Sequence, residues 1–222
     1  ANSGATLGTQ MDPENNFIAL NDNAVIMDRL DDTFKDAVSF NGTVYGVPQT
    51  SGMAGCVMYN KKVFADAGVE VPHTWDEFIE VCDTLQAAGV TPLIGTFGDA
   101  WTSQVLFLGD YYNLKSAEPE FAANFEAGTQ KYADTEAAIR SFSKFADVQK
   151  YYNEDYLSAT FSDGVDYLAE GEGAMWIMLT EVIPEIDALY GEEYTSQIGA
   201  FGVPGESADN HGLTVWEPNA LY

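Results

Sequence analysis

The sequence predicts an α/β fold with a largely parallel sheet. Short apolar runs that read as strands alternate along the chain with patterns typical of amphipathic helices. Strands that alternate with helices indicate layered α/β structure, because parallel strands need crossover connections. The chain has 222 residues and 46% apolar content, which is enough to bury a sizeable core. It contains no internal repeat, and no linker of the length that separates independent domains.

The first 59 residues predict a helix followed by two strands. Residues 1–22 are rich in Gly, Asn and Ser, and Met11-Asp12-Pro13 indicates a turn. Apolar residues recur every four positions over Ala24–Phe40, which predicts a helix. Asn41-Gly42 then predicts a tight turn into a strand over Thr43–Val47, and Gly55–Tyr59 is the next apolar run.

A well-defined helix start follows at Thr74. Thr74 and Glu77 have the spacing of a capping box, in which each side chain bonds the other residue's backbone amide. Gly89 is expected to end this helix, and Thr91–Gly95 reads as a short buried strand. One face of the helix is apolar and is expected to be buried: Trp75, Phe78, Ile79, Cys82 and Leu85.

The rest of the chain continues the alternation. Further helices are predicted over 101–112, 135–152, 162–171 and 182–189, and further strands over 174–179 and 198–203. The helix over 135–152 is expected to bury an apolar stripe made of Ile139, Phe142, Phe145 and Ala146.

Charge and cysteine content exclude several classes of protein. Lys and Arg total 9 against 35 Asp and Glu, a formal charge of −26, so phosphate backbones and anionic lipids should repel the chain. Nucleic acid is therefore not an expected partner. Cys56 and Cys82 lie in a strand and on a helix face, which favours two buried thiols over a disulfide. No apolar run approaches a membrane span, and no signal peptide opens this sequence.

The usual motifs of catalysis are missing. The sequence has no nucleophile elbow, no phosphate-binding glycine loop and no zinc-protease motif. His73 and His211 lie in loops, where solvated turn residues are the commoner case, so no catalytic residue, metal site or cofactor is expected. With 35 acidic residues, a pair of glycosidase carboxylates stays open as an alternative.

Five segments in order carry a resemblance to a known family. They are Y-G-V-P at 45–48 with Y-N-K-K-V-F at 59–64, V-P-H-T-W-D-E-F at 71–78, A-G-V-T-P-L at 88–93, G-E-G-A-M-W-I-M with V-I-P-E-I at 171–186, and I-G-A-F-G-V-P-G at 198–205 with the final P-N-A-L. The chain resembles extracellular solute-binding proteins of family 1, the maltose-binding-protein-like proteins that deliver carbohydrates to ABC importers. The resemblance implies a periplasmic-binding-protein-like two-lobe fold, present here as a fragment without roughly its first and last quarters.

The resemblance also implies a domain organisation. Residues 1–50 would be part of the first lobe, 51–213 the second α/β lobe, and 214–222 the return crossing into the first lobe. The two crossings would lie near Gln49–Cys56 and Gly212–Pro218.

Ligand contacts follow from the chemistry of sugars. A pyranose has an apolar C–H face and a ring of hydroxyls, so its sites combine aromatic rings with carboxylates and amides. Trp101 and Trp216 are expected at the ligand, with core packing as the alternative, whereas Trp75 and Trp176 are expected in the core. The positions that the resemblance implies for ligand contact are Asp99, Trp101, Thr180, Glu181, Trp216, Glu217, Thr50, Ser51 and Met53.

One position departs from the family. Where relatives commonly have Gly-Ser-Trp, with the Trp stacking on the sugar, this chain has Leu179-Thr180-Glu181. A carboxylate in place of the ring favours a ligand with polar or cationic groups, such as an amino sugar.

The resulting expectation is a non-enzymatic protein that binds a mono- or oligosaccharide and delivers it to the membrane permease of an ABC importer. It would act as a monomer outside the cytoplasm, as a cell-surface lipoprotein or in the periplasm. A carbohydrate-active hydrolase and a sugar-sensing binding module stay as alternatives. The sequence does not name the sugar.

Overall fold

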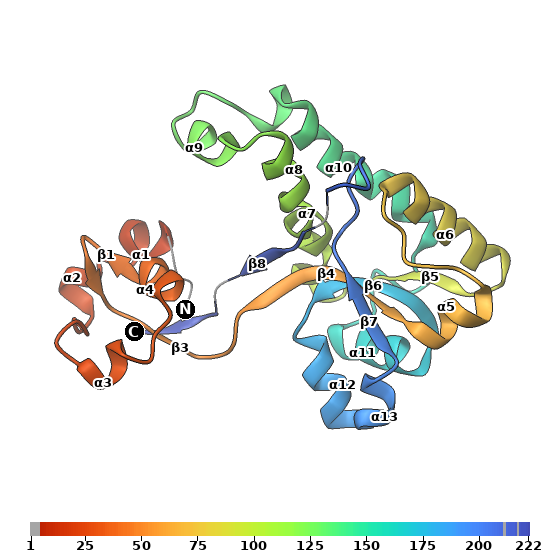
Figure 1. Ribbon diagram of the computed structural model, residues 1–222, viewed down its shortest axis with the longest axis horizontal. Coiled ribbons are helices and arrows are strands. Elements are labelled where there is room, and N and C mark those ends of the chain that lie inside the picture. The colour runs from red at the N-terminus through yellow and green to blue at the C-terminus, as the bar shows by residue number, and fades with distance from the viewer. Residues whose placement is uncertain (1–4, 211, 217) are drawn as a thin grey trace. The chain divides into compact units, whose positions relative to one another are not determined.

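The computed structural model describes residues 5–210, 212–216 and 218–222. The chain divides into two compact units (Figure 1). Unit 1 contains the residues up to Met53 and those from Val215 onward, and unit 2 contains Ala54–Thr214. The chain therefore passes between the units twice, after Met53 and after Thr214.

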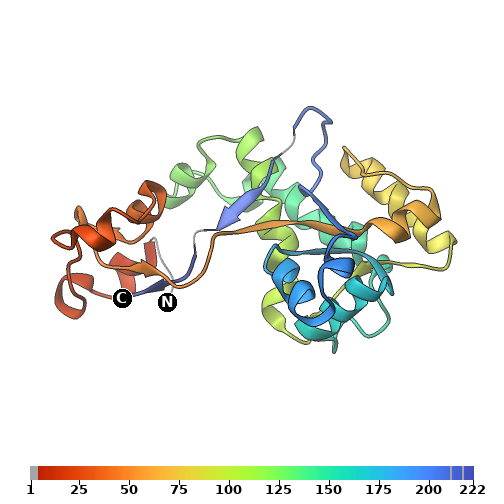
Figure 2. The same cartoon turned by 60° about the horizontal axis from the view of Figure 1, so that its bottom comes forward.

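Unit 1 is built from short helices and two small antiparallel sheets, β1–β2 and β3–β9. Because β3 pairs with β9, the end of the chain is part of this unit, as the C-terminal mark in Figure 2 shows. A small core of Phe34, Val38, Val44 and Ala220 holds it together. The elements are α1 (Ala5–Gln10), α2 (Pro13–Asn16), α3 (Ala24–Met27), α4 (Asp32–Ala37), β1 (Ser39–Phe40), β2 (Thr43–Val44), β3 (Val47–Pro48) and β9 (Ala220–Leu221).

The single helix predicted over 24–40 is wrong. Helix α3 ends at Met27, and a new helix begins after Asp31, whose carboxylate accepts a hydrogen bond from the amide of Thr33 at 2.9 Å. An Asp in this geometry starts a helix rather than continuing one, which explains the break. The last two predicted helical residues, Ser39 and Phe40, form β1 instead.

The predicted turn at Asn41-Gly42 is confirmed. Both residues have positive φ, 51° and 77°, and they join β1 to β2 as a two-residue hairpin requires. The strand predicted over 43–47 is broken into β2 and the start of β3.

Unit 2 contains one five-stranded mixed sheet and its covering helices. The strands are β4 (Met53–Asn60), β5 (Thr91–Ile94), β6 (Gly173–Leu179), β7 (Ile198–Phe201) and β8 (Thr214–Trp216). The division between the units falls after the first residue of β4 and after the first residue of β8, so Met53, Val215 and Trp216 are counted in unit 1. The helices are α5 (Lys61–Ala67), α6 (Trp75–Ala87), α7 (Val105–Gly109), α8 (Tyr111–Ala117), α9 (Phe121–Glu126), α10 (Glu136–Val148), α11 (Phe161–Glu170), α12 (Val182–Tyr190) and α13 (Glu192–Thr195). Short 3₁₀ helices are η1 (Ala100–Gln104), η2 (Tyr132–Asp134) and η3 (Gln149–Tyr151).

The α/β fold class is confirmed, but the expectation of a largely parallel sheet is wrong. The strand order is β5-β6-β4-β7, with β8 also paired to β4. Strand β6 is parallel to β5, whereas β4 runs antiparallel to both β6 and β7. The three strands that follow helices, β5, β6 and β7, thus share one direction. Strand β4, which brings the chain into the unit, is inserted against them.

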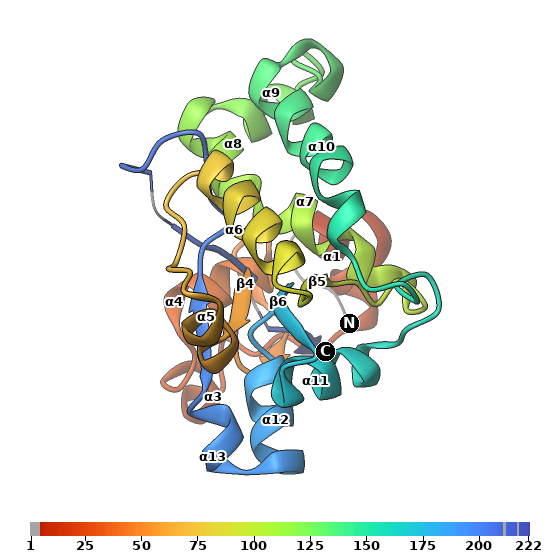
Figure 3. The same ribbon diagram turned by 90° about the vertical axis from the view of Figure 1, so that its right-hand side faces the viewer.

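Helices cover both faces of this sheet (Figures 1 and 3). Alternate residues of β6 divide between two cores: Met175 and Ile177 pack with α6 and α10, while Trp176 and Met178 pack with α11 and α12. The predicted core positions of Trp75 and Trp176 are confirmed, since each is 1% exposed.

Several local predictions in unit 2 are confirmed. The capping box of α6 is present, with the amide of Glu77 donating to the Thr74 hydroxyl at 3.2 Å and the Glu77 carboxylate accepting from the Thr74 amide. Gly89 has a φ of 79° just beyond the helix end. Cys56 and Cys82 are buried free thiols, as the sequence favours.

The buried face predicted for α10 is wrong at most of its positions. Phe145 is half-buried and packs against the core, but Ala146 is exposed. Ile139 and Phe142 are 50% and 52% exposed. The buried residues of this helix are Ala138, Ser141, Lys144 and Val148. A charged residue can occupy this face because the Lys144 ammonium donates to the Asp110 carboxylate at 2.6 Å. The helix predicted over 101–112 is also divided, into η1, α7 and the start of α8.

Candidate functional site

Several polar and aromatic side chains follow strands that end at one edge of the unit 2 sheet. Parallel strands β5 and β6 end there at Ile94 and Leu179. Strand β4 begins at the same edge, because Gly55 is paired with Leu179. In open α/β sheets, ligands bind outside the carboxyl ends of the parallel strands.

The loop after β5 presents Trp101 at this edge. The Thr102 hydroxyl donates to the carbonyl oxygen of Thr96 at 2.8 Å, and this bond closes the loop onto η1. Trp101 is 39% exposed, and its ring lies 5.6 Å from the ring of Phe161. Trp101 is therefore not a core residue, and it has an aromatic support and an accessible surface. That arrangement is what stacking on a ligand requires.

The same loop is held against the segment before α11. The amide of Gly98 donates to the carbonyl oxygen of Ala159 at 2.9 Å, and a Cβ at Gly98 would lie 2.4 Å from the carbonyl oxygen of Ser158. Asp99 accepts through Oδ2 from the amide of Phe161 at 2.7 Å. One carboxylate oxygen of Asp99 thus holds the start of α11. The other has no protein partner among residues 5–210, 212–216 and 218–222.

After β6 come Thr180 and Glu181. Thr180 is hydrogen-bonded to Ala54 in β4. Its hydroxyl accepts from the amide of Ala54 at 3.1 Å, and its amide donates to the Ala54 carbonyl oxygen at 3.0 Å. Glu181 is half-buried at the start of α12. Burial, with a further contribution from the charge of Glu185, raises the pKa of the Glu181 carboxyl group. Within the described part of the chain, Glu181 forms no ion pair.

The other predicted ligand positions that the structure describes belong to unit 1. Thr50 and Ser51 are exposed and Met53 is half-buried, and all three lie in unit 1. Trp216 is half-buried in β8 and also belongs to unit 1. Glu217 lies outside the described residues. The structure thus brings Asp99, Trp101, Thr180 and Glu181 to one sheet edge, and the ligand role of all nine positions stays a prediction.

Sequence reasoning missed Phe161, which supports Trp101. A local signal was present: Thr160 and Asp163 form a second capping box, with the Asp163 carboxylate accepting from the Thr160 amide at 2.7 Å. This pattern fixes the first turn of α11 and therefore the position of Phe161.

A separate groove of about 800 Å³ lies between α8, α10 and the 205–210 loop. None of the nine predicted ligand positions lines it. Its two cationic side chains are already paired, Arg140 with Asp147 and Glu206, and Lys144 with Asp110. Its other charged residues, Glu118 and Glu136, are carboxylates on the wall of the groove. This groove is therefore not our candidate site.

Two kinds of feature are absent from the described ranges. Those residues contain no group of three or more His, Cys, Asp or Glu side chains that could hold a metal ion. None of their helices has the length and apolar character of a membrane span.

The chain is similar in sequence to two named proteins. The chain is 24% identical over 198 residues to the multiple sugar-binding protein of Streptococcus mutans, covering 85% of this chain and 45% of that protein. It is 37% identical over 98 residues to the osmoprotective compounds-binding protein GgtB of Synechocystis sp., covering 40% of this chain and 22% of that protein.

Solved structures share the fold. A protein described in work on xylan utilization by Caldanaerobius polysaccharolyticus matches with a TM-score of 0.76 at 20% identity, over 92% of this chain and 52% of that one. The bacterial solute receptor AcbH, described as exclusive for β-D-galactopyranose, also gives 0.76 at 20% identity, over 98% and 56%.

The chain spans about half the length of these relatives or less, and it matches a partial two-lobe fold. The model of the bacterial extracellular solute-binding protein family matches residues 4–219. The chain therefore belongs to the bacterial extracellular solute-binding proteins.

Proposed function

We propose that this protein binds a mono- or oligosaccharide without transforming it, and that it delivers the sugar to the permease of an ABC importer. The observation that carries the proposal is Trp101, an exposed ring held by its loop at the carboxyl edge of the unit 2 sheet. The protein would work as a monomer, either anchored as a lipoprotein or free in the periplasm. Binding would shift the protein toward the conformation with higher affinity for the sugar.

The chemistry of the edge fits a sugar. The exposed ring of Trp101 can stack on the C–H face of a pyranose, while the carboxylates of Asp99 and Glu181 can accept from its hydroxyls. Similar proteins support this class of ligand, since one is named as a multiple sugar-binding protein and others are described with raffinose or mannobiose.

Binding can be tested by calorimetry on the full-length protein with galactose, raffinose, mannobiose, xylobiose and N,N′-diacetylchitobiose. Trp101→Ala should weaken the best of these by about 10- to 100-fold, the loss of one stacked ring, and Trp101→Phe should recover part of it. Phe125→Ala is the matched control, because Phe125 is a 48% exposed aromatic residue on α9, outside the predicted ligand positions. Equal affinities for wild type and Trp101→Ala would remove Trp101 from the site.

Glu181 suggests a narrower ligand class. A half-buried carboxylate that has no ion-pair partner among the described residues would gain most from a ligand that carries an ammonium group. We therefore propose a preference for an amino sugar, with Glu181 as its partner. A glucosamine disaccharide should bind more tightly than its neutral analogue N,N′-diacetylchitobiose, and Glu181→Gln should abolish the difference. Tight binding of neutral maltooligosaccharides that is insensitive to Glu181→Gln would contradict this preference.

Two alternatives have clear tests. A hydrolase would release reducing ends from the same glycans, whereas the proposed receptor releases none and closes around its ligand in small-angle scattering. A sugar sensor would leave uptake of the radiolabelled sugar unchanged when its gene is deleted. A transport protein would not.

A further inference from the structure

The segment 202–214, which joins β7 to β8, contains no helix or strand in its described residues before Thr214. It is also the last part of unit 2 before the chain crosses to unit 1. Its position is therefore fixed by hydrogen bonds to other elements. Most of these hydrogen bonds come from α10 and from the junction between α7 and α8, residues 109–113.

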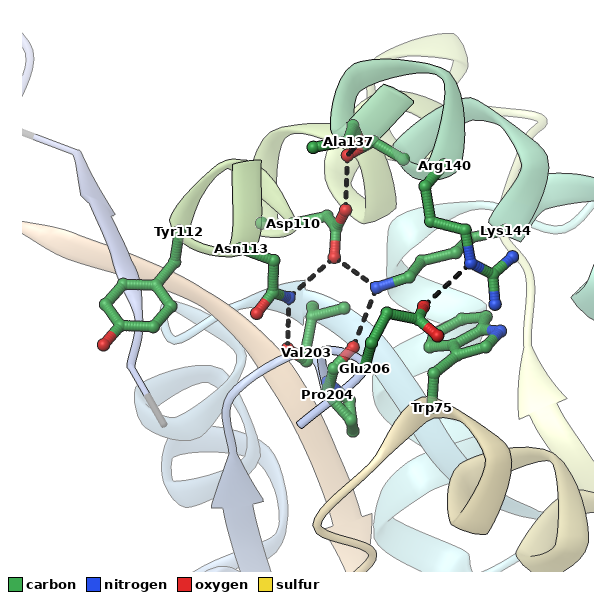
Figure 4. Close-up of polar contacts among 12 residues, drawn as sticks. Trp75, Asp110, Tyr112, Asn113, Ala137, Arg140, Lys144, Val203, Pro204 and Glu206 are labelled. Atoms are coloured by element: carbon green, nitrogen blue, oxygen red, sulfur yellow. Dashed lines mark hydrogen bonds and ion pairs between the residues drawn. The ribbon is translucent and has the colours of Figure 1, made fainter. Parts of the chain in front are cut away.

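The first end of the segment is bonded through consecutive carbonyl oxygens. Asn113 Nδ2 donates to the carbonyl oxygen of Val203 at 2.9 Å, and Lys144 Nζ donates to that of Pro204 at 2.8 Å. Asp110 orders both donors, since its Oδ1 accepts from Asn113 at 2.8 Å and from Lys144 at 2.6 Å. Figure 4 shows these side chains converging on the two carbonyl groups. The next carbonyl, of Gly205, accepts from the amide of Trp75 at 2.8 Å.

The far end of the segment is bonded to the same junction. The Thr214 hydroxyl donates to the carbonyl oxygen of Gly109 at 2.9 Å and accepts from the amide of Tyr112 at 3.0 Å. Gly212 lies against the ring of Tyr112, where a Cβ would come within 2.0 Å of it. Asn210 Nδ2 donates to Asn113 Oδ1 at 3.1 Å. Both ends of the segment are thus held by residues 109–113.

This junction continues the helical run that carries Trp101, because η1, α7 and α8 follow one another from Ala100 to Ala117. We propose that Asn113 and Thr214 are positioning residues. They hold the point at which the chain leaves unit 2 against the helical run that also carries Trp101. Movement of the units on sugar binding would then bend the chain beyond Thr214 and leave 202–214 in place. The affinity part of this proposal rests on the proposed sugar-binding function.

The test compares two substitutions at one position in the full-length protein. Thr214→Val keeps the side-chain shape and removes both hydrogen bonds, whereas Thr214→Ser keeps the hydroxyl and is the matched control. Without sugar, Thr214→Val should speed amide exchange in 203–214 about tenfold, the effect of losing one to two net hydrogen bonds, and Thr214→Ser should not. Asn113→Ala should have the same localised effect, because it removes the bond to Val203.

Sugar binding supplies a readout that a purely structural role would leave unchanged. The probe is the member of the neutral panel that binds wild type most tightly. Its dissociation constant should rise about tenfold in Thr214→Val, because binding must then also order the segment, and should return to within about twofold in Thr214→Ser. A lower melting temperature with an unchanged dissociation constant would overturn the positioning role. If wild type binds no sugar, the proposed function is wrong. Unaltered amide exchange in Thr214→Val would refute the positioning role in either case.

Discussion

The buried pair of Lys144 and Asp110 is the contact whose removal should damage unit 2 most. Both side chains are 2% exposed, and the ammonium lies 2.6 Å from Asp110 Oδ1. Lys144→Met preserves most of the volume but leaves the carboxylate buried without its cation. It also deprives the carbonyl oxygen of Pro204 of its charged donor.

The expected loss follows from these contacts. Removing one partner of a buried ion pair costs about 3–5 kcal/mol, because the remaining charge stays desolvated. The Asp110 carboxylate keeps hydrogen bonds from Asn113 and Ser141, so the lower part of this range is expected. For a unit of this size, a loss of 3–5 kcal/mol corresponds to a fall in melting temperature of roughly 6–20 °C.

Urea unfolding at pH 7, followed by tryptophan fluorescence, measures the loss. The double variant Asp110→Leu with Lys144→Met removes both charges and should recover at least about 1 kcal/mol relative to Lys144→Met alone. Strict additivity of the two single substitutions, or a cost below about 1 kcal/mol for Lys144→Met, would refute the idea that the pair is energetically coupled.

Three further predictions concern unit 2. Hydrogen bonds from Thr160 lower the pKa of Asp163, so its ionised form stabilises the fold above pH 3.8 and loses that effect as pH falls through the lowered pKa. The difference in unfolding free energy between wild type and Asp163→Asn should therefore shrink below pH 3.8, and a constant difference would contradict this. Gly164→Ala should destabilise by about 1–3 kcal/mol in urea unfolding despite a better helix propensity, because its Cβ would lie 2.5 Å from the Trp176 ring. Burial raises the pKa of Cys56 to about 11 and that of Cys82 further, so thiol reagents at pH 8 should label neither until the protein unfolds.

Sequence patterns predicted the elements whose causes are local. The capping box at Thr74 and the Asn41-Gly42 turn depend on side chains within three residues of the backbone they bond, so spacing alone was sufficient. The break after Met27 was also local. Asp31 caps a new helix there, although the apolar residues keep a four-residue spacing across the break.

Features with distant causes could not be predicted in this way. Lys144 can lie on the buried face of α10 because it is paired with Asp110. Asp110 is 34 residues away in the sequence, so the periodicity of the helix contains no information about this pair. Within the sequence of the helix alone, Ile139 and Phe142 belong to the more apolar stripe, so periodicity predicts the wrong buried face. The candidate site is similar: Trp101 could be singled out by residue type, but its support, Phe161, is 60 positions away.

The direction of β4 matters more for function than any of these. A parallel β4 would have placed its start at the opposite end of β6, seven residues or roughly 23 Å from Thr180. Because β4 runs against β6, Ala54 instead bonds Thr180 directly, and the chain enters unit 2 at the edge that carries Trp101 and Glu181. Alternating strands and helices predict the shared direction of β5, β6 and β7, but not a reversed strand inserted among them. The entry of the chain at the candidate edge is thus a consequence of topology, and residue patterns alone could not locate it.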